Sequence, residues 1–116
     1  MQILINTDHN ITLTENSRGE MESSVETALA HFASRLTRVE VHLSDQSAGR
    51  STGNDIHCLL EARPEGLDPQ LVTDDASSVD VALHGALHKM LHALETDYGR
   101  LDQHKGASSM GGIEPR

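Results

Sequence analysis

Aromatic side chains are nearly absent from this chain of 116 residues. It has no tryptophan, and Phe32 and Tyr98 are its one phenylalanine and its one tyrosine. A folded core must therefore be built mainly from aliphatic side chains, and the length suits one domain that needs no metal or disulfide for stability. The single cysteine, Cys58, cannot form an internal disulfide, which favours a reducing compartment.

Basic residues are also scarce. Nine Lys and Arg stand against 18 Asp and Glu, a formal charge of −9 with His neutral. Such a surface repels nucleic acid on average, so any RNA or DNA contact needs a local basic patch. The first residues lack the basic segment and the apolar length of a signal peptide, and no stretch reaches membrane-spanning length. We therefore expect a cytoplasmic protein.

The strongest pattern in the sequence is one apolar stripe between Ser77 and His104. Its members recur in steps of three and four: Val79, Leu83, Leu87, Met90, Leu94, Tyr98 and Leu101. This spacing predicts a long helix with one apolar face. Ser77 or Ser78 can cap its start, and Gly106 follows its end. A helix of this kind needs a broad apolar surface on which to pack.

The upstream segments have the patterns of that surface. Apolar and polar residues alternate over residues 38–44, which places Val39, Val41 and Leu43 on one face of a strand. Cys58 and Leu60 alternate with their neighbours in the same way. We expect strands over residues 2–7, 38–44, 56–63 and 68–73, a helix from the Thr14 cap to Leu36, and a hairpin loop over residues 45–54. The acidic pair Asp74-Asp75 is expected to be solvated turn residues.

The predicted order is β-α-β-β-β-α, an α+β domain over residues 1–104 followed by a flexible tail over 105–116. A right-handed crossover makes the first two strands parallel, and the other strands form an antiparallel meander. Packing both helices on one face of the four-stranded sheet buries both apolar stripes. The other face is then open to solvent and carries Glu40, His42, His57, Glu61 and Arg63.

Several segments resemble one protein family. The closest local match is His31 to Leu36 followed by Val39 to Ser44, and the last helix agrees at positions that include Gly85, Lys89 and Met90. Over about residues 1–105 the chain resembles the ribosome hibernation-promoting factors and ribosome-associated inhibitors, in their short, single-domain form. The resemblance implies a non-enzymatic, cytoplasmic stress factor that binds the small ribosomal subunit and its ribosomal RNA and inhibits translation.

The family grips ribosomal RNA with basic residues of the last helix and neighbouring strands. By this resemblance the candidate RNA-binding residues are Lys89, Arg100 and Lys105, with His92 and His104 at positions where the family is usually basic. Because imidazole gains a proton on mild acidification, we expect binding to strengthen as the pH falls. An alternative is a diverged protein-binding regulatory module on the same fold that does not bind ribosomes.

Three histidines, His84, His88 and His92, recur every four residues in the predicted helix. Two histidines at this spacing can share a metal ion. Successive members are separated by about 6 Å along a helix axis, so all three cannot easily meet one ion. We expect no metal site, no cofactor and no active site, and we interpret Cys58 as a small core residue. A metal-responsive histidine module is the third alternative for the function.

Overall fold

The computed structural model describes residues 1–47, 53 and 55–107, with side chains described as far as Gly99. Its elements are β1 (Gln2–Thr7), α1 (Glu15–Ala28), the 3₁₀ helix η1 (Ala30–Arg35), β2 (Leu36–Asp45), β3 (Ile56–Pro64), β4 (Gln70–Ala76) and α2 (Val79–Ala107). The predicted hairpin loop lies mostly, and the predicted tail from residue 108 wholly, outside the described residues.

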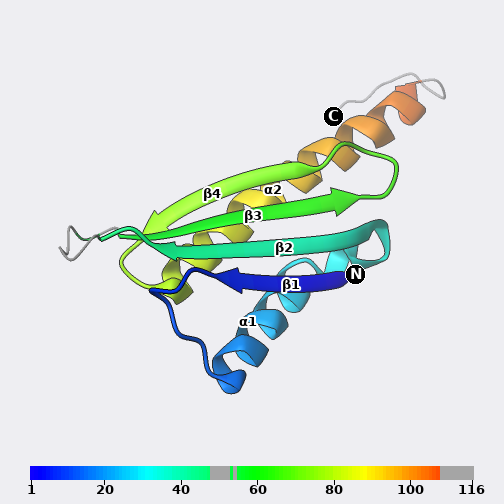
Figure 1. Cartoon of the computed structure of the whole chain (residues 1–116). Coiled ribbons are helices and arrows are strands. Elements are labelled where there is room, and N and C mark those ends of the chain that lie inside the picture. Colours follow the sequence, from blue (N-terminus) through cyan, green and yellow to red (C-terminus); the bar gives the residue numbers. More distant parts are fainter. Residues whose placement is uncertain (48–52, 54, 108–116) are drawn as a thin grey trace.

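The four strands form one sheet in the order β1-β2-β3-β4. β1 is parallel to β2, and the β2–β3 and β3–β4 pairs are antiparallel. Both helices lie on the same face of this sheet, with α1 beside β1 and α2 across β3 and β4 (Figure 1). The predicted fold class, strand order and placement of both helices are therefore confirmed.

The core lies between the sheet and the two helices. From α2, the side chains of Leu83, Leu87, Met90 and Leu94 are at most 3% exposed. They meet the inward residues of β2 and β3, which are buried as the alternation predicted. At one end, the ring of Phe32 stacks on that of Tyr98 with 5.4 Å between centroids. The only two benzene-type rings of the chain thus contact each other where η1 approaches α2.

The first helix is shorter than its apolar spacing predicted. α1 starts after the predicted Thr14 cap, whose hydroxyl accepts a hydrogen bond from the Ser17 N–H, but it ends at Ala28 instead of continuing to Leu36. Residues 30–35 form the 3₁₀ helix, and Leu36 already begins β2. Because a 3₁₀ helix repeats every three residues, Leu29 and Phe32 still point into the core. An apolar step of three therefore did not distinguish the two kinds of helix.

The region around β4 also differs from the prediction. The strand starts at Gln70 rather than Asp68 and extends to Ala76, so Asp74 and Asp75 are strand residues and not turn residues. In the following turn, the Ser78 hydroxyl accepts a hydrogen bond from the Val81 N–H at the start of α2. α2 then continues to Ala107, three residues beyond the predicted end. Within the described residues, no helix combines the length and the apolar character needed to cross a membrane.

Truncation of Leu87 should destabilise the fold strongly. Leu87 is 3% exposed in the contact between α2 and the sheet, so Leu87→Ala removes buried surface and leaves a cavity. We expect a loss of about 2–5 kcal/mol in the free energy of unfolding, measured by urea denaturation. If the variant unfolds at the same urea concentration as the parent, the position of α2 in the core is wrong.

Cys58 should make stability depend on alkaline pH. Burial raises the pKa of its thiol from 9.0 to about 12, and the negative charge of Asp74 acts in the same direction. Between about pH 9 and 12 the unfolded chain loses this proton while the folded chain keeps it. The thiol therefore contributes a loss of up to about 1.4 kcal/mol per pH unit as the pH rises.

The check is urea unfolding across this pH range for the parent and for Cys58→Ala. We expect the variant, whatever its absolute stability, to lose stability less steeply with pH. The same slope in both proteins would show that the folded state does not hold the Cys58 proton.

Candidate nucleic-acid interface

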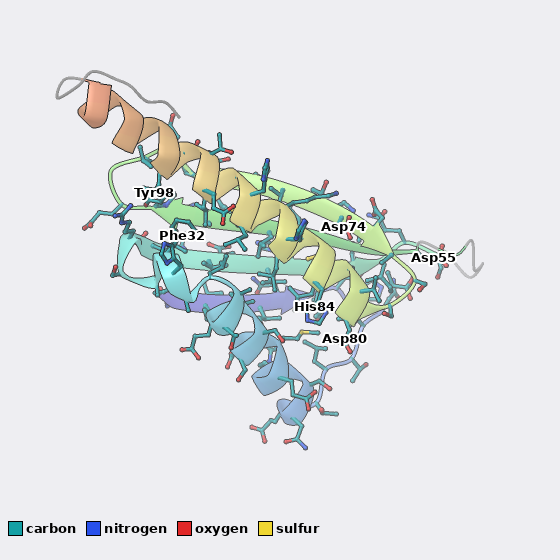
Figure 2. All side chains as sticks on the ribbon, turned by 180° about the vertical axis from the view of Figure 1, so that it is seen from behind. Phe32, Asp55, Asp74, Asp80, His84 and Tyr98 are labelled. Atoms are coloured by element: carbon teal, nitrogen blue, oxygen red, sulfur yellow. The ribbon has the colours of Figure 1, made fainter. Side chains whose placement is uncertain are left out.

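The candidate interface is the side of α2 that faces away from the sheet. Lys89, His92 and their neighbours His84 and His88 are exposed on α2, and Figure 2 labels His84 near the start of this helix. Arg100, His104 and Lys105 belong to the last turns of α2, but their side chains lie outside the described residues. The structure therefore places all five candidate residues on one helix and shows that the side chains of Lys89 and His92 are exposed. A role of any of the five in RNA binding stays a prediction.

Lys89 is held by the edge of the sheet. Its Nζ donates a hydrogen bond to the Thr73 carbonyl of β4 at 2.7 Å and lies 2.9 Å from Asp74 Oδ1. The lysine side chain remains 52% exposed. Any phosphate at Lys89 must therefore share the ammonium group with Asp74 or displace this carboxylate.

Gly85 gives Asp74 room for this contact. A Cβ atom at position 85 would lie 2.6 Å from Asp74 Cγ and would overlap the carboxylate. Because Gly85 has no side chain, the half-buried carboxylate of Asp74 lies directly against α2, one turn before Lys89. Asp74 is labelled in Figure 2. Sequence reasoning missed this contact because it read Asp74 as a turn residue.

Arg18 makes an equivalent contact at the opposite edge of the sheet. Its Nη1 donates a hydrogen bond to the Ile5 carbonyl of β1 at 2.6 Å. β1 and β4 are the two edge strands, and exposed edges present unpaired backbone groups that favour association with other chains. A basic side chain from the overlying helix therefore covers one carbonyl on each edge.

The other described basic side chains also have partners within the chain. The guanidinium of Arg35 lies 4.7 Å from the centre of the Tyr98 ring. On the open sheet face, Arg63 pairs with Glu61 at 3.6 Å, and Arg38 Nε lies 2.9 Å from Glu40 Oε2, although without hydrogen-bond geometry. All five basic residues whose side chains are described thus make an intramolecular contact.

The open face of the sheet combines both signs of charge. The register places Arg38 opposite Arg63 and Glu40 opposite Glu61. Toward the other end of the strands, His42 Nε2 lies 3.2 Å from a Glu40 oxygen and His57 Nδ1 lies 2.7 Å from an Asp75 oxygen. The polar residues predicted for this face are therefore there, and they neutralise one another rather than form a basic patch.

Neither this face nor α2 presents a metal site in the part of the chain with described side chains. No group of three or more His, Cys, Asp and Glu there is arranged to hold one ion. His84, His88 and His92 are all exposed along α2. What these histidines offer chemically is positive charge on protonation.

Comparison with known proteins shows similarity in fold and none at the level of a family. No family model and no curated protein matches the sequence. Similar solved structures include the following two. The N-terminal domain of Thermus thermophilus Protein Y has a TM-score of 0.62 and 15% identity, over 83% of this chain and 98% of that one. A ribosomal subunit interface protein from Coxiella burnetii has a TM-score of 0.64 and 10% identity, over 85% of this chain and 99% of that one.

At identities this low, the structural similarity shows a shared fold and nothing more specific. The chain therefore has the β-α-β-β-β-α fold of the Protein Y N-terminal domain and of the ribosomal subunit interface protein. The resemblance inferred from the sequence is confirmed at this level.

Gly85→Ala should free Lys89 from Asp74 at little cost in stability. Alanine stabilises a helix interior by about 1 kcal/mol relative to glycine. The lost ion pair at the protein surface contributes about 0.2–1 kcal/mol. We expect stability within about 1 kcal/mol of the parent and faster acylation of Lys89 by an amine-reactive reagent, followed by mass spectrometry.

Gly99→Ala is the matched control, because a Cβ atom there meets nothing within 4 Å. It should leave acylation of Lys89 unchanged. A Lys89 that reacts no faster in Gly85→Ala than in Gly99→Ala would mean that Asp74 does not restrain it.

Proposed function

We propose that the protein is a non-enzymatic, cytoplasmic factor that binds the small ribosomal subunit and inhibits translation, as part of a stress or hibernation response. The observation that carries the proposal is the fold, which is shared with the Protein Y N-terminal domain and a ribosomal subunit interface protein. The coverage supports it, because nearly the whole of each of those chains is matched.

The exposed side of α2 is the surface we assign to ribosomal RNA. Lys89 and His92 are exposed on it, and the sequence places Arg100, His104 and Lys105 on the same helix. Phosphate oxygens accept hydrogen bonds from ammonium, guanidinium and protonated imidazole groups. With three permanent positive charges at most, and Asp74 beside Lys89, this surface supports few phosphate contacts and a weak affinity.

The alternative function is a protein-binding regulatory module on the same fold. The observation that favours it is the internal pairing of all five basic side chains that are described. A surface whose cations are engaged with its own carboxylates and carbonyls has little left for phosphate. A folded protein partner, by contrast, does not require a basic surface.

Sedimentation with ribosomes separates the two functions. Purified protein is mixed with ribosomes from starved cells at low salt and centrifuged through a sucrose gradient, and translation of a reporter is measured in a cell-free extract. The proposal expects the protein in the small-subunit fractions and reduced translation. Absence from those fractions together with unchanged translation would leave the protein-binding alternative.

Charge reversal on α2 should abolish the interaction. In the double variant Lys89→Glu/Arg100→Glu, two of the three cations become anions on a surface that already lacks positive charge, so co-sedimentation with the small subunit should be lost. The control is Arg38→Glu/Arg63→Glu, which makes the same change of charge on the open sheet face and should still sediment. Binding that survives in the α2 variant and disappears in the control would move the interface to the open face.

Binding should also strengthen as the pH falls through the histidine range. Protonation of exposed imidazoles on α2 adds positive charge next to the RNA phosphates, and protonating all eight His moves the formal charge from −9 to −1. The measurement is affinity for purified small subunits at pH 5.8 and 7.8 at constant ionic strength.

The test variant replaces His84, His88, His92 and His104 by Gln, and the control replaces His42 and His57, which lie on the open sheet face. We expect the pH response to vanish in the first and to persist in the second. Affinity of the parent that is flat between the two pH values would show that these histidines do not contact RNA.

A further inference from the structure

The outer edge of β1 has backbone groups that face away from the sheet. The Asp8 N–H donates to the Leu43 carbonyl of β2, and the Ile5 carbonyl accepts from Arg18 on the other side. Since the N–H and C=O groups of successive residues point to opposite sides of a strand, those of Ile3 and Ile5 share the outward side. Arg18 covers the Ile5 carbonyl, and the Ile3 end of the strand extends beyond this contact.

A hollow of about 300 Å³ lies beside this end of β1, between the strand and α1. It is lined by Met1, Ile3, Gly19, Glu22, Ser23 and Glu26. The side chain of Ile3 points to the helix side of the sheet, because the residue beside it on β2 is the buried Val39. The hollow thus lies between the side chains of Met1 and Ile3 and an acidic wall from α1.

No described basic side chain pairs with the glutamates of this wall. α1 carries Glu15, Glu20, Glu22 and Glu26, and its one basic residue, Arg18, reaches to the Ile5 carbonyl. Within the described part of the chain, none of the four glutamates forms a salt bridge. Gly19 leaves open space at the surface of the helix, because a Cβ atom there would meet nothing within 4 Å.

We propose that the β1 edge and this hollow bind an extended, basic segment of a partner protein by strand addition. The segment pairs with the outward N–H and C=O groups of Ile3, as peptides do at exposed sheet edges. Every second side chain then enters the hollow. A Lys or Arg at that position lays its aliphatic stem on Met1 and Ile3 and its charge against Glu22 and Glu26.

The same charges decide against two other occupants. A second copy of this chain that paired β1 antiparallel to β1 would place the two acidic walls on the same side of the joined sheet, where they would repel each other. A nucleic-acid backbone would bring phosphates to the glutamates. A basic polypeptide is the partner whose charge complements this edge, and the inference does not depend on ribosome binding.

The test is an NMR titration of the full-length, ¹⁵N-labelled protein with a ten-residue peptide that alternates lysine and threonine, beside the same peptide with glutamate in place of lysine. We expect the basic peptide to shift the amides of Ile3, Ile5, Glu22 and Glu26, and the acidic peptide to shift none of them. Shifts spread evenly over α1, or no binding of the basic peptide, would overturn the proposal.

Two pairs of variants separate a specific site from general attraction. Glu22→Lys/Glu26→Lys should weaken peptide binding at least tenfold, whereas Glu15→Lys/Glu20→Lys, with the same change of charge on the same helix, should weaken it less than twofold. Gly19→Met fills the hollow and should also weaken binding tenfold, while Gly99→Met on α2 should not. Thermal unfolding of each variant confirms that the fold is kept.

Equal losses in the two lysine pairs would reduce the effect to long-range charge and overturn the site. So would shifts of the Ile3 and Ile5 amides that depend on protein concentration in the absence of peptide, because these would indicate a second copy at the edge. Preserved binding in Gly19→Met would show that no side chain enters the hollow.

Discussion

Burial of the apolar stripe of α2 against the sheet is the contact on which the rest of the structure depends. Leu83, Met90 and Leu94 are at most 1% exposed, and at roughly 1.5–3 kcal/mol for each fully buried large apolar side chain they form a major part of the core. Because the chain has almost no aromatic residues, this aliphatic contact replaces the larger area that rings would bury. It also fixes the helix beside the edge strand β4, which brings Lys89 to the Thr73 carbonyl, and it brings Tyr98 to Phe32 at the far end.

This packing leaves a four-stranded sheet with two edges, and the chain uses scarce positive charge to cover them. Arg18 and Lys89 each bind a carbonyl of an edge strand. Under the proposed function Lys89 has two competing tasks, because the residue assigned to RNA phosphate also covers the edge and pairs with Asp74. The edge protection is incomplete at the start of β1, where the acidic wall of α1 adjoins the outward backbone groups of Ile3. The structure thus presents few cations on α2 and an acidic wall at β1.

The sequence predicted most of this fold because its main signals are local. Alternation identified β2 and β3, and the steps of three and four identified α2. The prediction that the first helix continues to Leu36 was wrong, because an apolar spacing of three suits both an α-helix and the 3₁₀ helix observed over residues 30–35. Asp74 was misread because two adjacent acidic residues are typical of turns, and nothing local shows that Gly85 and Lys89 will lie beside them. The contacts of Arg18 and Lys89 were also unpredictable, since each joins a helix to a strand through tertiary packing. Sequence spacing could identify Lys89 and His92 as exposed helix residues, but not the partners of Lys89.

The salt dependence of binding to purified small ribosomal subunits tests the central claim most directly. The claim is that the protein meets ribosomal RNA through a few cations of α2, because its other described cations are engaged within the fold. Affinity measured from low to physiological salt should be detectable at low salt and should fall with a log–log slope of about −1 to −3, as expected for one to three neutralised phosphates. A slope of about −6 or steeper would require an extensive basic interface that this account does not provide, and the absence of binding at low salt would contradict ribosome association itself.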